Sequence, residues 1–217
     1  MRATSNLLLL LAAAIWGFAF VAQRVGMDHV GPYTFNGIRF ALGGLSLIPL
    51  IIYFSTHSKE EEKSADSPPT AKASRVGLLA GAILFIAASL QQIGLVYTTA
   101  GKAAFITCLY IVLVPITGIF LKQRITLNTW LGSVLAVIGL YFLCVKESLT
   151  ISYGDLLELI GAFFWTAHIL LIDHYSRKVD TLKLACVQFL TCSVLSLITA
   201  LAIETITLDG ILQAGIP

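Results

Sequence analysis

Long apolar segments separated by short polar breaks make up most of the chain. A helix rises about 1.5 Å per residue, so roughly 20 apolar residues are needed to cross the hydrocarbon core of a bilayer. Seven segments approach or reach that length: Asn6–Gln23, Phe35–Phe54, Val76–Thr98, Gly101–Leu121, Thr129–Val145, Gly154–Ile172 and Leu182–Ile203. The pattern predicts an all-α integral membrane protein with seven transmembrane helices.

The polar breaks are short, with one exception. Met27–Pro32, Lys122–Arg124 and Lys146–Ser148 have the length of turns. The connector Ser55–Ser74 is charged and contains Pro68-Pro69, which predicts a flexible, solvated loop. The N-terminal segment resembles a signal peptide in part, but its apolar run continues to a spanning length. We therefore expect an uncleaved first span, with cleavage as the alternative.

Composition agrees with a membrane protein. Apolar residues make up 57% of the chain and charged residues 12%, against about 45–50% and 25% in soluble domains. The net charge of +2 gives no reason to expect a nucleic-acid partner. All four cysteines lie in apolar segments without metal-binding or redox spacing, so we expect no cofactor and no metal.

The distribution of basic residues predicts the orientation. With the N-terminus inside, the inner loops hold ten lysines and arginines and the outer loops three, and Arg39 lies within a span. Cytoplasmic loops carry the excess of basic residues in membrane proteins. We expect a multi-pass protein of the cell membrane with a cytoplasmic N-terminus.

A weak internal repeat connects the first and sixth segments. Trp16 and Trp165 lie 149 positions apart, and the same offset places Ile38-Arg39-Phe40 on Val187-Gln188-Phe189. A repeat of five spans enters the membrane in the opposite sense the second time, which is the inverted-repeat plan of secondary transporters. We expect a first five-helix repeat over 1–146 and an incomplete second repeat over 147–217, part of a ten-helix (5+5) fold. By the same offset, residue 217 corresponds to residue 68, so the second repeat lacks three helices of the ten-helix plan. Either the chain is a fragment, which we favour, or a partner such as a second copy supplies these helices.

Several motifs resemble the EamA-type transporters of the drug/metabolite transporter superfamily. They are Ala14-Ile15-Trp16-Gly17-Phe18-Ala19-Phe20-Val21, Phe35-Asn36-Gly37-Ile38-Arg39-Phe40, Tyr97-Thr98-Thr99-Ala100-Gly101-Lys102-Ala103-Ala104-Phe105-Ile106-Thr107 with Val114-Pro115, and Trp130-Leu131-Gly132 through Gly139-Leu140-Tyr141. The resemblance covers essentially the whole chain. It implies ten helices in two inverted copies, both termini inside, and movement of small metabolites by alternating access. Many members carry a glutamate where this chain has Gln123, so the role of that acid is not carried over.

Polar and aromatic residues inside the spans are the candidates for substrate binding. A charge at mid-membrane costs about 2.5–3.5 kcal/mol on insertion scales, so Arg39 either contacts an anionic group of the substrate or snorkels and bonds helix carbonyls. Trp16 and Trp165 lie near the middle of their helices, away from the interfacial belts. They either line a cavity between the first and sixth spans or pack between helices.

Four more residues are weaker candidates. Gln91 and Gln92 are adjacent, and successive helical residues diverge by about 100°, so we expect only one of them to face a cavity. Tyr110 could also face a polar path. His168 is the only histidine deep in a span, and Glu158 lies about one turn inside its helix end, so proton coupling has little support here.

Two further predictions concern backbone and metal. Pro115 cannot donate to the Ile111 carbonyl, so we expect it to bend or break its helix as a hinge, with ordinary packing as the alternative. His168, Asp173 and His174 do not share a helical face, so they do not form a metal site.

The sequence therefore favours a secondary transporter or permease of a small organic metabolite or drug. Its alternative is a non-transporting assembly subunit or an inactive remnant. An enzyme is disfavoured, because the chain has no GxSxG, no HExxH, no paired acids within a span and no phosphate-binding glycine loop. The expected partners are the lipid bilayer and a small-molecule substrate.

Overall fold

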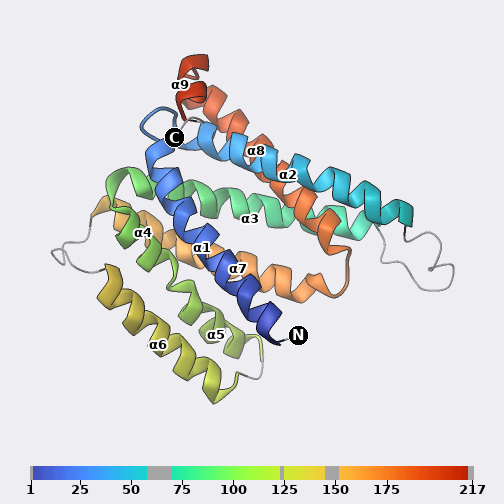
Figure 1. Cartoon of the computed structure of the whole chain (residues 1–217), viewed down its shortest axis with the longest axis vertical. Coiled ribbons are helices and arrows are strands. Elements are labelled where there is room, and N and C mark those ends of the chain that lie inside the picture. The colour runs from blue at the N-terminus through green and yellow to red at the C-terminus, as the bar shows by residue number, and fades with distance from the viewer. Residues whose placement is uncertain (1, 58–69, 123–124, 145–151, 215–217) are drawn as a thin grey trace.

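A computed structural model describes residues 2–57, 70–122, 125–144 and 152–214, and within these residues the fold is entirely helical (Figure 1). The described helices are α1 (Arg2–Gly26), α2 (Pro32–His57), α3 (Thr70–Tyr97), α4 (Ala100–Thr107), α5 (Tyr110–Phe120), α6 (Leu127–Cys144), α7 (Tyr153–Ser176), α8 (Thr181–Ile203) and α9 (Leu208–Ala214).

Six of the seven predicted spans are confirmed as helices long and apolar enough to cross a membrane. They are α1, α2, α3, the α4–α5 pair, α7 and α8. The segment predicted over Thr129–Val145 is α6, but its apolar stretch in the described chain, Leu127–Gly139, is shorter than a span. A seventh crossing remains a prediction. The short helix α9 was not expected from the sequence.

The distribution of polarity differs from that in a soluble protein. Large apolar side chains face outward: Phe18 is 78% exposed, Phe120 82% and Leu201 75%. The largest fully buried side chains include Gln92, Glu158, Asn36 and Thr34. A monomer with such a large apolar surface would not be stable in water, whereas lipid accommodates apolar side chains. The chain is a multi-pass membrane protein.

The helices pack in a sequence that Figure 1 displays from top to bottom. α2 packs on α8, α8 on α3, α3 on α7, and α7 on α4 and α5, with α6 at the far edge against α4 and α5. α1 runs diagonally across this stack and touches mainly α3 and α4. Most of the α1 side chains are exposed, so α1 is the least enclosed of these spans.

Two hydrogen bonds join α2 and α8 at their crossing. Ser193 Oγ donates to the Gly37 carbonyl oxygen at 2.7 Å, and Cys186 Sγ donates to the Gly44 carbonyl oxygen at 3.5 Å. Gly37 and Cys186 are 149 positions apart, as are Gly44 and Ser193. The same offset that relates the tryptophans therefore converts one contact into the other.

Helix termini at one end of the bundle are tied together by two carboxylates. Glu204, at the end of α8, accepts hydrogen bonds from the Tyr33 and Thr34 backbone N–H groups at 2.8 and 2.9 Å and from Thr34 Oγ1 at 2.7 Å. Asp155 forms a capping box with Ser152 at the start of α7, and it also contacts Lys102 Nζ at 3.0 Å and Thr98 Oγ1. A carboxylate next to a helix N-terminus is stabilised by the free N–H groups and by the helix dipole.

The interruption in the fourth span does not lie at Pro115. α4 ends at Thr107 and α5 begins at Tyr110, while Pro115 lies inside α5. The carbonyl of Ile111, which Pro115 leaves without its helical donor, accepts a hydrogen bond from Ser133 Oγ on α6 at 3.2 Å. A neighbouring helix therefore satisfies the freed group. The break falls where i→i−3 hydrogen bonds replace the α-helical ones, as from Leu109 N to Ile106 O and from Ile111 N to Cys108 O.

Several sequence-based predictions lie outside the described residues. They concern Pro68-Pro69, Gln123, and the boundary between the two repeats at residues 146–147. At the described ends of the long connector the prediction of a loop was too wide, because α2 continues to His57 and α3 begins at Thr70.

Candidate functional site

A cavity of about 450 Å³ lies between α1, α2, α3, α7 and α8. This is within the usual range for small-molecule sites. Aromatic and aliphatic side chains provide most of its wall, and a few polar groups interrupt them. The lining residues are Ile15, Trp16, Ala19, Gln23, Arg39, Phe40, Gly43, Leu84, Gln91, Trp165, His168, Gln188 and Phe189.

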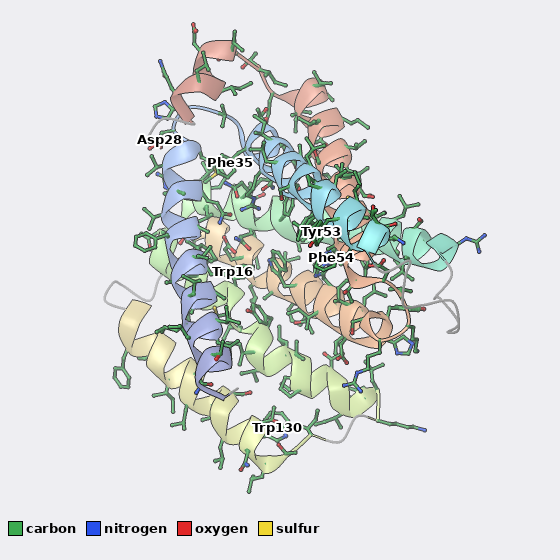
Figure 2. All side chains as sticks on the ribbon, turned by 45° about the vertical axis from the view of Figure 1, so that its right-hand side comes forward. Trp16, Asp28, Phe35, Tyr53, Phe54 and Trp130 are labelled. Carbon is green, nitrogen blue, oxygen red and sulfur yellow. The ribbon has the colours of Figure 1, made fainter. Side chains whose placement is uncertain are left out.

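Five of the seven predicted site residues meet at this cavity. Trp16, Arg39, Gln91, Trp165 and His168 come from four different helices, yet all of them line it. Trp16 is labelled midway along α1 in Figure 2, and its side chain is 57% exposed. This convergence is a tertiary fact, because no two of these residues except Trp165 and His168 are close in sequence.

Gln92 and Tyr110 do not line the cavity. Gln92 is fully buried, and its Nε2 donates to the Gln23 carbonyl oxygen at 3.5 Å, so it links α3 to α1. Tyr110 is the first residue of α5. The two adjacent glutamines thus point in different directions, as helical geometry predicts.

Arg39 is held in place by its own helix. Its Nη2 donates to Asn36 Oδ1 at 2.9 Å, and the guanidinium carbon lies 4.7 Å from the centroid of the Phe40 ring. Asn36 is fully buried, and its Nδ2 donates to the Ala88 carbonyl oxygen at 3.1 Å on α3. Arg39 Nε is buried and has no hydrogen-bond partner in the described chain. Arg39 lines the cavity, while its Nε is enclosed by the protein.

Hydrogen bonds between side chains connect the cavity walls. Trp165 Nε1 donates to Gln91 Oε1 at 3.0 Å, and Gln91 Nε2 donates to Gln23 Oε1 at 3.4 Å. This chain joins α7, α3 and α1. Across the cavity, His168 Nε2 and Gln188 Oε1 are 3.0 Å apart, which joins α7 to α8. The polar groups that hydrocarbon cannot satisfy are therefore paired with one another.

Several pairs of residues related by the 149-position offset line this cavity together. The related pairs that line it are Trp16 with Trp165, Ala19 with His168, Arg39 with Gln188, and Phe40 with Phe189. The Phe40 and Phe189 rings are in contact, with centroids 5.7 Å apart.

Sequence reasoning missed Gln23, Gln188 and Glu158. Gln188 could have been found, because the repeat alignment already placed it opposite Arg39. Gln23 ends a predicted span, and no signal marked it. Glu158 lies near a helix end, which gave it little weight, but the structure buries it completely between α7, α3 and α4.

The charge of the cavity is one-sided. Arg39 is the one residue of the described lining with a permanent charge, and no acidic residue of the described chain lines the cavity. Within the described residues no group of three or more histidine, cysteine or acidic side chains could hold a metal ion. The site therefore offers a cation, amide and indole donors, and aromatic surfaces.

Comparison with known proteins agrees with this picture. The profile of the EamA-like transporter family matches residues 3–145. A curated "uncharacterized transporter" of Archaeoglobus fulgidus is 33% identical over 201 residues, which cover 90% of this chain and 57% of that protein. The uncharacterized transporter YoaV of Bacillus subtilis is 26% identical over 70% of this chain and 51% of its own length. The chain thus spans a little over half the length of these relatives. No solved structure matches the chain.

Proposed function

Because the chain belongs to the EamA-like transporter family, we propose that it forms the larger part of a secondary transporter for a small organic solute. The proposed solute site is the cavity between α1, α2, α3, α7 and α8. The observation that carries this proposal is that residues related by the 149-position offset line one cavity. Side chains related by one sequence offset come from α1 and α7 and from α2 and α8, and they meet at a single space. Inverted-repeat transporters bind substrate at such an interface between repeats.

The reciprocal contacts at the α2–α8 crossing support the same plan. A two-fold relation between residues 1–146 and 147–217 would make Ser193–Gly37 and Cys186–Gly44 equivalent contacts. In this arrangement the second repeat continues beyond α8 in a ten-helix protein of the cell membrane with a cytoplasmic N-terminus. Alternating access then consists of one repeat rocking against the other around the cavity.

The chemistry of the lining favours an organic anion with an apolar or aromatic body. None of the ion pairs of the described residues involves Arg39, and a guanidinium without a carboxylate partner attracts a carboxylate or a similar anionic group. Trp16, Phe40, Trp165 and Phe189 provide flat apolar surfaces for the remainder of the solute.

The test is solute flux in liposomes reconstituted with the protein as its host produces it. A panel of aromatic and aliphatic carboxylates is compared with their neutral amides. Charged hydrogen bonds contribute about 1.5–3 kcal/mol, so Arg39→Gln is expected to weaken binding of the carboxylates roughly 10- to 100-fold and of the amides much less.

Arg24→Gln is the matched control, since Arg24 is an exposed arginine paired with Asp28 at 2.9 Å on α1, outside the cavity. It removes the same charge and is expected to leave flux unchanged. If Arg39→Gln affects acids and amides equally, the anion assignment is wrong. If no solute of the panel crosses the membrane, a non-transporting assembly role becomes the better explanation.

A further inference from the structure

Glu158 is a buried acid that does not line the cavity. Its side chain is fully buried on α7. Oε2 accepts a hydrogen bond from Thr107 Oγ1 at 2.7 Å, and Oε1 is buried without any hydrogen-bond partner in the described chain. None of the ion pairs of the described residues involves Glu158.

The carboxyl group lies in a niche built by three helices. A Cβ atom added to Gly94 of α3 would lie 2.9 Å from both Cγ and Oε1 of Glu158, so any larger residue there would force the Glu158 side chain to move. Thr107 is the last residue of α4, just before the interruption that separates α4 from α5. Interrupted helices mark ion and substrate sites in transporters.

The other ionisable groups on these helices do not compensate a charge on Glu158. On α4, Lys102 pairs with Asp155 of α7 at 3.0 Å. On α7, His168 contacts Gln188, and on α3, Tyr97 contacts the Tyr153 ring. Cys108 and Tyr110, which follow the α4 break, are neutral in their usual forms. Asp155, one turn before Glu158, carries the same charge sign and disfavours a second carboxylate.

A carboxylate with one donor and no cation is a poor occupant of such a niche, whereas a neutral carboxylic acid is an acceptable one. We propose that Glu158 is a proton-binding site that couples solute movement to proton movement, an inference that rests on the transport function proposed above. In the state described here the acid carries its proton. When α7 separates from α3 and α4, water reaches Oε1 and accepts the proton of Glu158. The helices close again only after Glu158 has been reprotonated.

The coupling route is short. Glu158 meets Gly94 at the α3–α7 interface, and the same interface carries the Trp165–Gln91 hydrogen bond of the cavity wall. A solute that displaces this bond changes the α3–α7 contact that encloses Glu158. Conversely, an ionised Glu158 destabilises the closed interface.

The experiment compares two transport modes in liposomes containing the full protein: accumulation driven by a pH gradient, and exchange of labelled for unlabelled solute at equal pH. Glu158→Gln copies the neutral acid but cannot release a proton. It is expected to retain exchange and to lose both gradient-driven accumulation and solute-dependent proton movement, measured with a trapped pH-sensitive dye. Asp28→Asn is the matched control, since Asp28 is an exposed acid on the α1–α2 turn, and it is expected to retain both modes.

Infrared spectroscopy supplies a readout that does not depend on flux. The wild-type protein is expected to show the C=O stretch of a buried carboxylic acid at neutral pH. Glu158→Gln should remove this band, and Thr107→Val, which removes the hydrogen bond to Oε2, should shift it. Coupling is refuted if Glu158→Gln retains gradient-driven accumulation, and the proton site is refuted if the wild type lacks the band. A wild-type protein that moves no solute refutes the transport function and the coupling together, while a Glu158-dependent band would still support the proton site.

Discussion

The backbones of α3 and α7 approach each other closely at Gly154, and this contact leads to a specific prediction. A Cβ atom added at Gly154 would lie 2.6 Å from the Gly94 carbonyl oxygen, 2.9 Å from the Tyr97 carbonyl carbon and 3.0 Å from the Thr98 nitrogen. All three atoms belong to the backbone, so no side chain can rotate away. Ordinary contact begins near 3.4 Å, so Gly154→Ala has to move α7 away from α3 by about 0.8 Å, the difference between 3.4 and 2.6 Å.

Overpacking of this kind costs typically 1–3 kcal/mol. Gly161→Ala is the matched control, because Gly161 lies on the same helix, seven residues or about two turns later, and faces the same partner helix. Its added Cβ would lie 3.5 Å from Leu90 Cβ and 3.7 Å from the Ala87 carbonyl oxygen, which is ordinary contact. Alanine is a better helix former than glycine by up to about 1 kcal/mol, so Gly161→Ala should be neutral or stabilising.

The measurement is the free energy of unfolding of the purified protein in mixed micelles, titrated with a denaturing detergent and followed by helical circular dichroism. We expect Gly154→Ala to unfold at a lower detergent fraction than the wild type, and Gly161→Ala at the same fraction or a higher one. Equal stability of the two variants would mean that the backbones of α3 and α7 are not in contact at Gly154. It would also contradict the close packing of α3 against α7 that encloses the neighbouring Glu158.

Two further predictions concern other contacts. Ser133→Ala should destabilise the protein by about 1 kcal/mol in the same titration, because the Ile111 carbonyl loses its donor. The effect of Ser133→Ala should be smaller in a Pro115→Ala background, because residue 115 then supplies a backbone N–H to this carbonyl. An equal effect in both backgrounds would contradict this account. Glu204→Gln should cost about 1–2 kcal/mol, because the acceptor of three hydrogen bonds at the start of α2 loses its charge. A loss that is the same at low and high salt would argue against the electrostatic part of that explanation.

The hydrophobic pattern was enough to predict the helices and the membrane environment. Spans can be read from a sequence because lipid requires long, continuous apolar runs whose backbone groups bond within the run. The 149-position offset between Trp16 and Trp165 can also be read from the sequence, and the same offset pairs Gln188 with Arg39. The bounds of α2 and α3 differ from the prediction because polar residues next to a span can continue the helix into the polar region.

Tertiary structure decided which polar residues act together. The sequence pattern could not tell which of Gln91 and Gln92 faces a cavity. The packing of α3 against α7 and α1 decides this, because it places Gln91 in the cavity lining and leaves Gln92 outside it. The position of Pro115 suggested a break, yet Ser133 on α6, the next helix along the chain, satisfies the freed carbonyl and α5 continues. Glu158 lies one turn from a helix end, where acids are common, and its burial follows from Gly94 and Thr107, which lie more than 50 positions away in the chain. Patterns along one segment record its exposure to lipid, whereas the pairing of polar groups depends on contacts between segments, which local sequence does not encode.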